Sequence, residues 1–505
     1  MASLKALASQ TVWYGLSNIA SRFLNYLLTP LLTYLLADAS GMQHYGELTI
    51  LYAAIAFANV IFTYGMETAY FRFSHQKDVN RESLYQTSLS SLLFSTLGLC
   101  LLLYFFRQPI AHFFELSAFP YYITWCLWII AFDTLAALPF ARLRQEGRPR
   151  RYAFVKVSGI LVNIACTVWV IGYGPRYIAA HPESLYARWA APYTATGLLL
   201  LSNLAASAFT FLMLFPEWKS LRFRMDTALW KKVLAYALPF VIIGLGGMVN
   251  ETIDRILLQK LLPGTQEAAK QTVAIYSANY KLAIFITLFI QAFRMAAEPF
   301  FFREAGAENA HKTYARVMNW FVITLCLALL TTVLFLDVWK YMVGAPYRSG
   351  LGIVPILLWA NVCLGVYYNL SVWYKNTGKL GYGTAITLIG AAVTLVLNVL
   401  FIPRFGMWAA AWTTFAAYFV MVLLSWVWGQ KFYPVPYDLK RIGSYLGMAL
   451  LLQMIHLFMR GHLSKPLLLM EGVALFGVFL FFVFWKEKEG LGRMPVVGKW
   501  VRKVG

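Results

Sequence analysis

Fourteen apolar stretches, separated by short polar loops, account for most of the sequence. An α-helix of roughly 20 apolar residues is long enough to cross the hydrocarbon core of a bilayer. Apolar residues make up 60% of this chain and charged residues 13%, whereas soluble domains contain about 50% and about 25%. We therefore predict an all-α polytopic membrane protein with about 14 transmembrane helices, which leaves little of the chain for a soluble domain.

The spans are placed by their hydropathy and by the charged loops that flank them. Glutamine and histidine at positions 453 and 456 make the thirteenth stretch less apolar than the others. The predicted spans are 11–36, 45–64, 86–106, 120–140, 152–173, 193–215, 233–253, 273–295, 315–336, 350–373, 381–402, 407–428, 442–459 and 466–485.

The net charge of +21 is spread over alternate loops instead of forming one patch. Counted from the N-terminus, one set of loops and ends carries 27 Lys and Arg residues, and the other set carries 11. Cytoplasmic loops of membrane proteins are enriched in these residues. Both chain ends are therefore predicted to be cytoplasmic, in a bacterial inner membrane. The positive charge then encodes orientation and contact with anionic lipids, and nucleic acid is not an expected partner.

Motifs for enzymatic chemistry are missing from the sequence. It contains no Asp-x-Asp pair, Walker loop, nucleophile elbow or metal-spaced His/Cys cluster. All five cysteines fall within predicted spans, where they are spaced like small core residues. The longest loops on the predicted outer side, near 174–192 and 254–272, are short for a membrane glycosyltransferase or polymerase. We expect no catalytic residues, no metal and no cofactor, and leave coupling to protons or sodium ions open.

Polar residues follow one helical face of the first predicted span. They recur at steps of three or four residues, at Asn18, Arg22, Asn25, Thr29 and Thr33. An arginine at the centre of a membrane helix costs ~2.5–3.5 kcal/mol on insertion scales. One interpretation is a water-filled cavity in which Arg22 faces an anionic substrate, because a guanidinium binds phosphate through paired hydrogen bonds. The alternative is a structural pair between Arg22 and Asp133 or another buried acid.

Four further polar residues within or beside the spans are candidates for the same cavity. Asn250 is predicted to contact substrate, and Lys281 is the second candidate cation of the cavity. The alternative for Lys281 is an ion pair with Asp254, which lies near the outer interface, where charges cost less. Asp133 either carries a coupling proton or neutralises Arg22.

The stretch NVLFIPRFGMWAAAWTTFAAY, from Asn398 to Tyr418, is similar to the turn Asn-x3-Ile-Pro-x2-Gly-x2-Gly-Ala-Ala-x2-Thr. This turn is typical of the multidrug/oligosaccharidyl-lipid/polysaccharide flippase superfamily, in its O-antigen and capsule translocase branch, which the sequence resembles. The positions that fit are Asn398, Ile402, Pro403, Gly406, Ala410 and Thr413, while Trp408 and Ala409 stand where the family often has small residues such as glycine. VAIYSANYKLA (Val273–Ala283) and GMETAYFRF (Gly65–Phe73) resemble the start of its eighth helix and the end of its second.

The resemblance implies two pseudo-symmetric six-helix lobes around a central cationic cavity, with two further helices appended. The lobes would be 1–232 and 233–430, and 431–505 would hold helices 13 and 14 and a basic cytoplasmic tail. It also implies alternating access, in which an undecaprenyl-diphosphate-linked oligosaccharide passes from the inner to the outer leaflet. Arg22 and Lys281 would bind the diphosphate, and Asn18, Asn25 and Asn250 the sugar hydroxyls.

Other functions stay open at this point. Within the superfamily, the alternatives are a lipid II flippase for peptidoglycan and a cation-coupled multidrug exporter, although the first helix carries Arg22 where a buried carboxylate would favour an exporter. A membrane glycan polymerase or ligase is disfavoured by the short outer loops. We expect a monomer whose partners are the lipid-linked oligosaccharide and anionic lipids, with the polysaccharide polymerase machinery as a further candidate.

Overall fold

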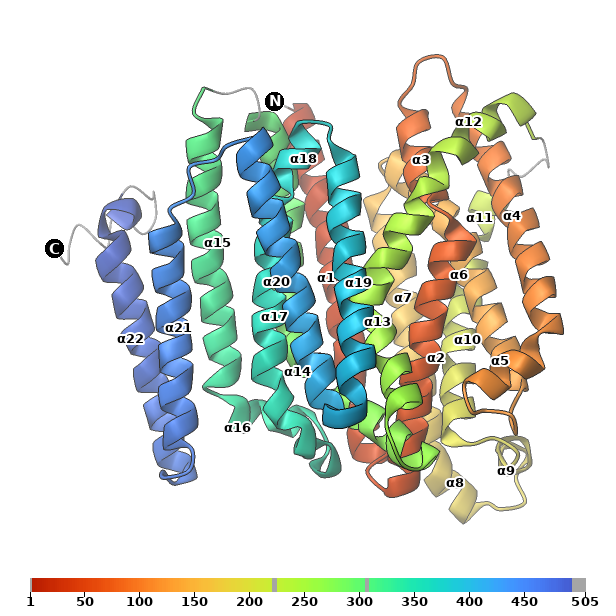
Figure 1. Cartoon of the computed structure of the whole chain (residues 1–505). Coiled ribbons are helices and arrows are strands. Elements are labelled where there is room, and N and C mark those ends of the chain that lie inside the picture. Colours follow the sequence, from red (N-terminus) through yellow and green to blue (C-terminus); the bar gives the residue numbers. More distant parts are fainter. Residues whose placement is uncertain (1, 220–224, 305–307, 493–505) are drawn as a thin grey trace. The chain divides into compact units, whose positions relative to one another are not determined.

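The structure is a computed structural model, and every regular element that it describes is helical (Figure 1). It describes the backbone of residues 2–219, 225–304 and 308–492, and the side chains of these residues except 2–18, 296, 298, 299, 302, 303 and 489–492. In this part of the chain, thirteen helices or runs of adjoining helices are long and apolar enough to cross a membrane. They match predicted spans two to fourteen, and the first span falls in α1 (Ala2–Leu35). The chain is an all-α, multi-pass membrane protein.

Several spans consist of more than one helical segment. Up to the middle of the chain the elements after α1 are α2 (Ala39–Thr63), α3 (Met66–Ser74), α4 (Arg81–Phe105), α5 (Arg107–Phe113), α6 (Tyr121–Gln145), α7 (Pro149–Thr167), the π-helix η1 (Val168–Tyr173), α8 (Gly174–Ala180), α9 (Leu185–Ala190), α10 (Ala195–Met213), α11 (Phe215–Trp218), α12 (Thr227–Ala237) and α13 (Pro239–Leu261). The later elements are α14 (Gln266–Glu304), α15 (Ala310–Val333), α16 (Leu336–Trp339), the 3-10 helices η2 (Lys340–Met342) and η3 (Ala345–Ile353), α17 (Val354–Leu370), α18 (Val372–Asn376), α19 (Leu380–Phe405), α20 (Met407–Phe432), α21 (Leu439–Met459) and α22 (Lys465–Gly492).

Contacts between residues divide the chain into two compact units. The first unit comprises Met1–Lys281, Val343–Gly350 and Thr384–Ala417, and the second comprises Leu282–Met342, Leu351–Gly383 and Tyr418–Gly505. All features discussed below lie within one unit or the other. The lobe boundaries predicted from the sequence stay a prediction.

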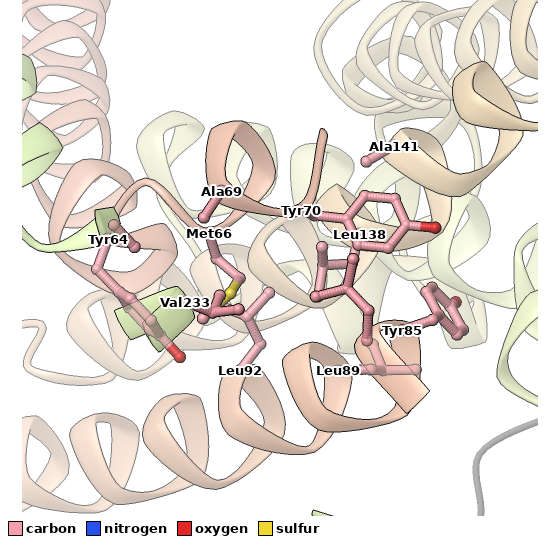
Figure 2. Close-up of a cluster of buried hydrophobic side chains, with 12 residues drawn as sticks. Tyr64, Met66, Ala69, Tyr70, Tyr85, Leu89, Leu92, Leu138, Ala141 and Val233 are labelled. Atoms are coloured by element: carbon pink, nitrogen blue, oxygen red, sulfur yellow. The ribbon is translucent and has the colours of Figure 1, made fainter. Parts of the chain in front are cut away.

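A cluster of buried side chains holds four helical segments of the first unit together (Figure 2). Its members come from the α2–α3 junction, α4, α6 and α12, and they are Tyr64, Met66, Ala69, Tyr70, Leu84, Tyr85, Leu89, Leu92, Leu138, Ala141, Val233 and Ala237. Lipid tails are as apolar as these side chains, so close packing holds membrane helices together more than exclusion of water does. Gly65 permits the sharp turn between α2 and α3, because its φ of +71° is in the left-handed region.

Ion pairs join the loops that carry the predicted cytoplasmic charge. Glu217 is buried, and its carboxylate accepts from Arg151 (Nη2–Oε2, 3.0 Å) and from Arg148 (Nη1–Oε1, 3.4 Å). Arg142 binds Glu146 at 2.7 Å. Partial burial favours protonation of Glu146, but the Arg142 guanidinium outweighs it and lowers the pKa of this carboxyl below its ordinary value. Part of the positive charge of these loops is therefore neutralised within the protein.

In the second unit, α21 and α22 form a hairpin whose polar residues face protein neighbours. The indole Nε1 of Trp359 on α17 donates to Oε1 of Gln453 on α21 at 2.9 Å. On the same helix, Nδ1 of His456 lies 2.7 Å from Oε2 of Glu471 on α22, and the histidine is 3% exposed. Polar side chains in lipid are costly unless they find partners. Gln453 and His456, which make the thirteenth span less apolar, serve to hold this helix to its neighbours.

Candidate binding cavity

A cavity of about 400 Å³ opens among the helices of the first unit. Its walls come from α1, α2, α7, α10, α13 and α14. The lining residues are Asn25, Leu28, Thr29, Leu32, Tyr45, Leu48, Thr49, Tyr52, Ala53, Asn163, Thr167, Leu199, Asn203, Thr252, Arg255, Ser277 and Lys281. Ten of these side chains can donate or accept hydrogen bonds without carrying a charge, and two are cations.

The two cations lie on neighbouring helices, Arg255 on α13 and Lys281 on α14. They are close enough to interact electrostatically. Among the side chains that the structure describes, Lys281 has no carboxylate within ion-pairing distance, because Asp254 pairs with Arg255 instead (Oδ1–Nη1, 3.0 Å). Two like charges held together at low dielectric favour an anion between them. This wall of the cavity therefore suits a negatively charged ligand.

Asp254 positions Arg255. Its carboxylate accepts from the Arg255 backbone N–H at 2.9 Å and from the Tyr276 hydroxyl of α14. Nη1 of Arg255 also donates to the Glu251 carbonyl at 2.8 Å, and the guanidinium lies 4.6 Å from the centre of the Tyr280 ring. A guanidinium fixed by several partners loses little further freedom when it binds a ligand. Asp254 is thus a positioning residue for the cationic wall.

The helices α1, α7 and α10 line the cavity with carboxamides and hydroxyls. Asn25 and Asn163 make no hydrogen bond to any other side chain or backbone group that the structure describes. Asn203 accepts from Ser207 at 3.5 Å and lies within interaction range of the Tyr52 hydroxyl. A carboxamide carries two donor hydrogens and one acceptor oxygen, so this wall can satisfy both hydroxyl donors and hydroxyl acceptors of an uncharged polar ligand.

Of the residues predicted for substrate binding, Asn25 and Lys281 line this cavity. Arg22 is exposed on α1, one turn before Asn25, and is not among the described residues that line the cavity. Its role as a phosphate ligand stays a prediction. The side chain of Asn18 lies outside the described residues.

The structure places the two predicted carboxylates in different settings. Asp133 on α6 is exposed and lies within interaction range of Ser207 on α10 and Lys156 on α7. Asp254 is buried and ion-paired, as described above. The proposed alternative of a Lys281–Asp254 pair is therefore replaced by the Arg255–Asp254 pair, because Arg255 follows Asp254 directly and its guanidinium folds back onto that carboxylate. A coupling role for either acid stays a prediction.

Asn250 bridges α13 to α19 and does not point its amide at the cavity. Its Nδ2 donates to the Thr387 carbonyl at 3.1 Å, and its Oδ1 accepts from the Thr394 hydroxyl at 3.0 Å. The side chain is 6% exposed. We interpret Asn250 as a structural residue that joins two helices, although substrate contact was predicted for it.

Replacing Asn250 with alanine is expected to lower the stability of the protein by about 1–2 kcal/mol, because the Thr387 carbonyl and the Thr394 hydroxyl each lose a partner. Thermal unfolding in detergent measures this loss. Thr394→Val supplies the matched comparison, and the double variant should lose less than the sum of the two single losses. Strict additivity would show that the two side chains do not interact.

An ion-pair network that the sequence did not reveal lies beside the cavity. Glu47 on α2 and Lys270 on α14 are each 5% exposed, and Nζ of Lys270 lies 2.9 Å from Oε1 of Glu47. Oε2 of Glu47 accepts from the Thr196 hydroxyl at 2.8 Å and lies 3.4 Å from Nδ1 of His44. Lys270 also donates to the Glu115 carbonyl at 3.0 Å. The pair therefore ties α2, α14, α10 and the α5–α6 loop together.

The backbones of α2 and α14 meet at the same place. A Cβ added to Gly46 would lie 2.0 Å from the Lys270 carbonyl oxygen, so no larger residue fits there without moving a helix. One turn closer to the middle of α2, the Thr49 hydroxyl accepts from Ser277 of α14 at 3.4 Å, and both residues line the cavity. The backbones of α2 and α14 are therefore in direct contact beside the cavity.

No group of three or more His, Cys, Asp or Glu side chains in the described part of the chain could hold a metal ion. The five cysteines are free, and Cys126 and Cys326 are buried.

Comparison with known proteins gives one family and one fold. Residues 7–305 match the model of a family described as polysaccharide biosynthesis protein. No curated protein matches the sequence significantly. A solved structure of the lipid II flippase MurJ, in an inward closed conformation, matches with a TM-score of 0.71 and 12% identity over 94% of this chain and 99% of that chain.

Multidrug transporters share the fold as well. An inward-facing MATE family transporter of the MOP superfamily matches with a TM-score of 0.61 and 13% identity, over 86% of this chain and 95% of that one. A mutant of the Vibrio cholerae MATE transporter VcmN matches with a TM-score of 0.52 and 15% identity, over 85% and 98%. At such identities, these likenesses concern the fold.

Proposed function

Because the chain belongs to the polysaccharide biosynthesis protein family, we propose that it is a flippase for an undecaprenyl-diphosphate-linked oligosaccharide. The cargo would be a repeat unit of O-antigen, capsule or exopolysaccharide, moved from the inner to the outer leaflet. The protein would act as a transporter in a bacterial inner membrane, with both ends in the cytoplasm, and it would carry out no covalent chemistry.

The observation that supports this proposal is that cationic and uncharged polar side chains line the same cavity. Arg255 and Lys281 provide a cationic wall, and three asparagines with several hydroxyls provide an uncharged polar wall. A lipid-linked oligosaccharide has the same two parts in its headgroup, a diphosphate and a set of sugar hydroxyls. The cavity therefore offers partners for both parts of the headgroup.

The physical problem that such a protein solves is desolvation. A diphosphate with attached sugars cannot enter hydrocarbon unaided, because its charges and hydroxyls would lose their hydrogen bonds to water. The cavity would replace this water with Arg255, Lys281 and the asparagines, while the lipid tail stays among other lipid tails. Exposing that cavity first to one side and then to the other, by rocking two helical lobes, would complete the transfer.

A lipid II flippase is the second candidate, since the MurJ structure covers 94% of this chain. Lipid II also carries a diphosphate between lipid and sugar, so the cavity alone does not separate the two cargoes. A multidrug exporter is less favoured, because the cavity of this protein is lined by two cations and no carboxylate among the described residues.

Deletion of the gene, followed by analysis of lipid-linked glycans, tests the proposal. We expect loss of surface polysaccharide, with the intact oligosaccharide-lipid accumulating in the inner leaflet. Plasmid-borne wild-type protein should restore the polysaccharide. Cell lysis with accumulation of lipid II would support the peptidoglycan role instead, and unpolymerised units reaching the outer leaflet would overturn the flippase proposal in favour of a polymerase.

A further inference from the structure

The charged residues and the asparagines of the cavity lie on different helices. Both cations come from α13 and α14, whereas the three asparagines come from α1, α7 and α10. Among the described residues of its lining, the asparagine side carries no charged group. A ligand with a charged end and an uncharged polar end would therefore be held in one orientation only.

We propose that the sugar attached directly to the diphosphate binds to Asn163 and Asn203, and that this wall selects an uncharged sugar at that position. This inference rests on the proposed function, because it assumes a lipid-linked saccharide as the ligand. It adds the orientation of the headgroup in the cavity and the class of sugar that the cavity accepts.

Asn163 is the clearest part of the argument. It lies on α7 and lines the cavity, and it has no hydrogen-bond partner among the groups that the structure describes. Its side chain is partly exposed, and a carboxamide offers two donor hydrogens and one acceptor oxygen. A ligand hydroxyl or amide at this position can bind these atoms directly, without first displacing a protein partner.

Asn203 is held in place by its neighbours, which leaves part of its amide for the ligand. Its side chain interacts with Ser207 of the same helix and with Tyr52 of α2. Of the hydrogen bonds that a carboxamide can make, these contacts account for only some. Asn203 thus offers a fixed partner for a sugar hydroxyl next to the adaptable Asn163.

The wall formed by Asn25, Asn163 and Asn203 carries no charge, and this affects which sugars can bind there. Its carboxamides can bind hydroxyl and amide groups equally well, since they donate and accept. They cannot neutralise a carboxylate, and a charged group that is taken out of water without an opposite charge carries a large desolvation cost. An acidic sugar in the first position should therefore bind less tightly than a neutral hexose.

The test compares two lipids on the purified full-length protein in nanodiscs, by native mass spectrometry or thermophoresis. The probes are undecaprenyl diphosphate and undecaprenyl diphosphate that carries one neutral hexose. The wild-type protein should bind the hexose-bearing lipid about tenfold more tightly, as expected for two or three added hydrogen bonds. A third probe with one hexuronic acid should lose most of this gain.

Substitutions then show which residues provide the added affinity for the hexose-bearing lipid. Asn163→Ala should bind both lipids with similar affinity, and Asn163→Leu, which keeps the size of the side chain, should behave in the same way. Asn203→Ala should remove part of the gain. Retained affinity for undecaprenyl diphosphate shows that each variant is folded. Asn59→Ala serves as the matched control, because Asn59 lies on α2 outside the described lining of the cavity.

The outcomes separate this inference from the function on which it rests. If the wild-type protein binds neither lipid, the proposed function fails. Equal binding of both lipids would show that Asn163 and Asn203 do not bind the first sugar, while the flippase proposal stands. The same conclusion follows if the tenfold gain in affinity persists in the Asn163→Leu, Asn203→Ala double variant. Tighter binding of the hexuronic acid probe than of the hexose probe would overturn the selectivity for uncharged sugars.

Discussion

Lys281→Gln is expected to abolish surface polysaccharide without lowering the amount of protein in the membrane. Lys281 lines the cavity beside Arg255, and no described carboxylate pairs with it. Its removal therefore leaves no acid uncompensated, so the fold should tolerate it. A charge-assisted hydrogen bond to phosphate contributes about 1.5–3 kcal/mol, so affinity for undecaprenyl diphosphate should fall about tenfold or more. Complementation of the deletion strain and lipid binding by the purified variant measure the two effects.

Two further variants test whether the effect of Lys281→Gln comes from the loss of a positive charge in the cavity. Lys281→Arg keeps the charge in a different shape and should restore part of the polysaccharide. Lys231→Gln removes a lysine of α12 that is exposed and outside the cavity, and it should behave like the wild-type protein. Normal polysaccharide from Lys281→Gln at normal abundance would rule out a phosphate-binding role for this residue.

Glu47→Ala is expected to destabilise the protein by about 3–5 kcal/mol, because it leaves the Lys270 ammonium buried without its counter-charge. Lys270 would keep only its contact with the Glu115 carbonyl. The free energy of unfolding, from denaturant titration in mixed micelles, measures the loss. Low membrane abundance in cells should accompany it.

A double-mutant cycle identifies the ion pair as the cause. Glu47→Leu combined with Lys270→Met removes both charges and should be more stable than either single variant, since no buried charge remains unpaired. The control is Glu183→Ala, which breaks the exposed pair with Arg188 and should change stability little. If Glu47→Ala is as stable as Glu183→Ala, the buried pair does not contribute to the fold.

The spans could be predicted from the sequence because lipid imposes a simple requirement. A segment that crosses a bilayer must be apolar over about 20 residues and must satisfy its backbone as a helix, so hydropathy alone located spans two to fourteen. The predicted flippase superfamily is likewise confirmed, by the family model and by the fold. The O-antigen and capsule branch stays a prediction.

The cavity could be predicted only in part. Asn25 and Lys281 stood out because they interrupt apolar spans, and both line it. Arg255 did not stand out in the sequence, because it directly follows the seventh predicted span, where charged residues are common. Its burial depends on Asp254 and on Tyr276 of the next helix, a tertiary arrangement that no local pattern contains.

The neutral wall and the Glu47–Lys270 pair were missed for different reasons. Asn163 and Asn203 carry no charge, and whether an asparagine faces a cavity depends on how several helices pack. Glu47 lies inside a predicted span and was a usable signal, but its partner Lys270 falls in what was predicted to be a loop, 223 residues further along the chain. Pairing at such a distance follows from the fold and not from spacing.

The backbone contact at Gly46 has a mechanical consequence. Where side chains separate two helices, changes of rotamer let the helices shift slightly. Here the carbonyl of Lys270 packs directly against Gly46, which has no side chain. Because Gly46 has no side chain that could adjust, α2 and α14 must move as whole helices at this joint, and their separation also breaks the Glu47–Lys270 pair. A movement that parts these two helices therefore has to overcome the backbone contact and the buried ion pair together.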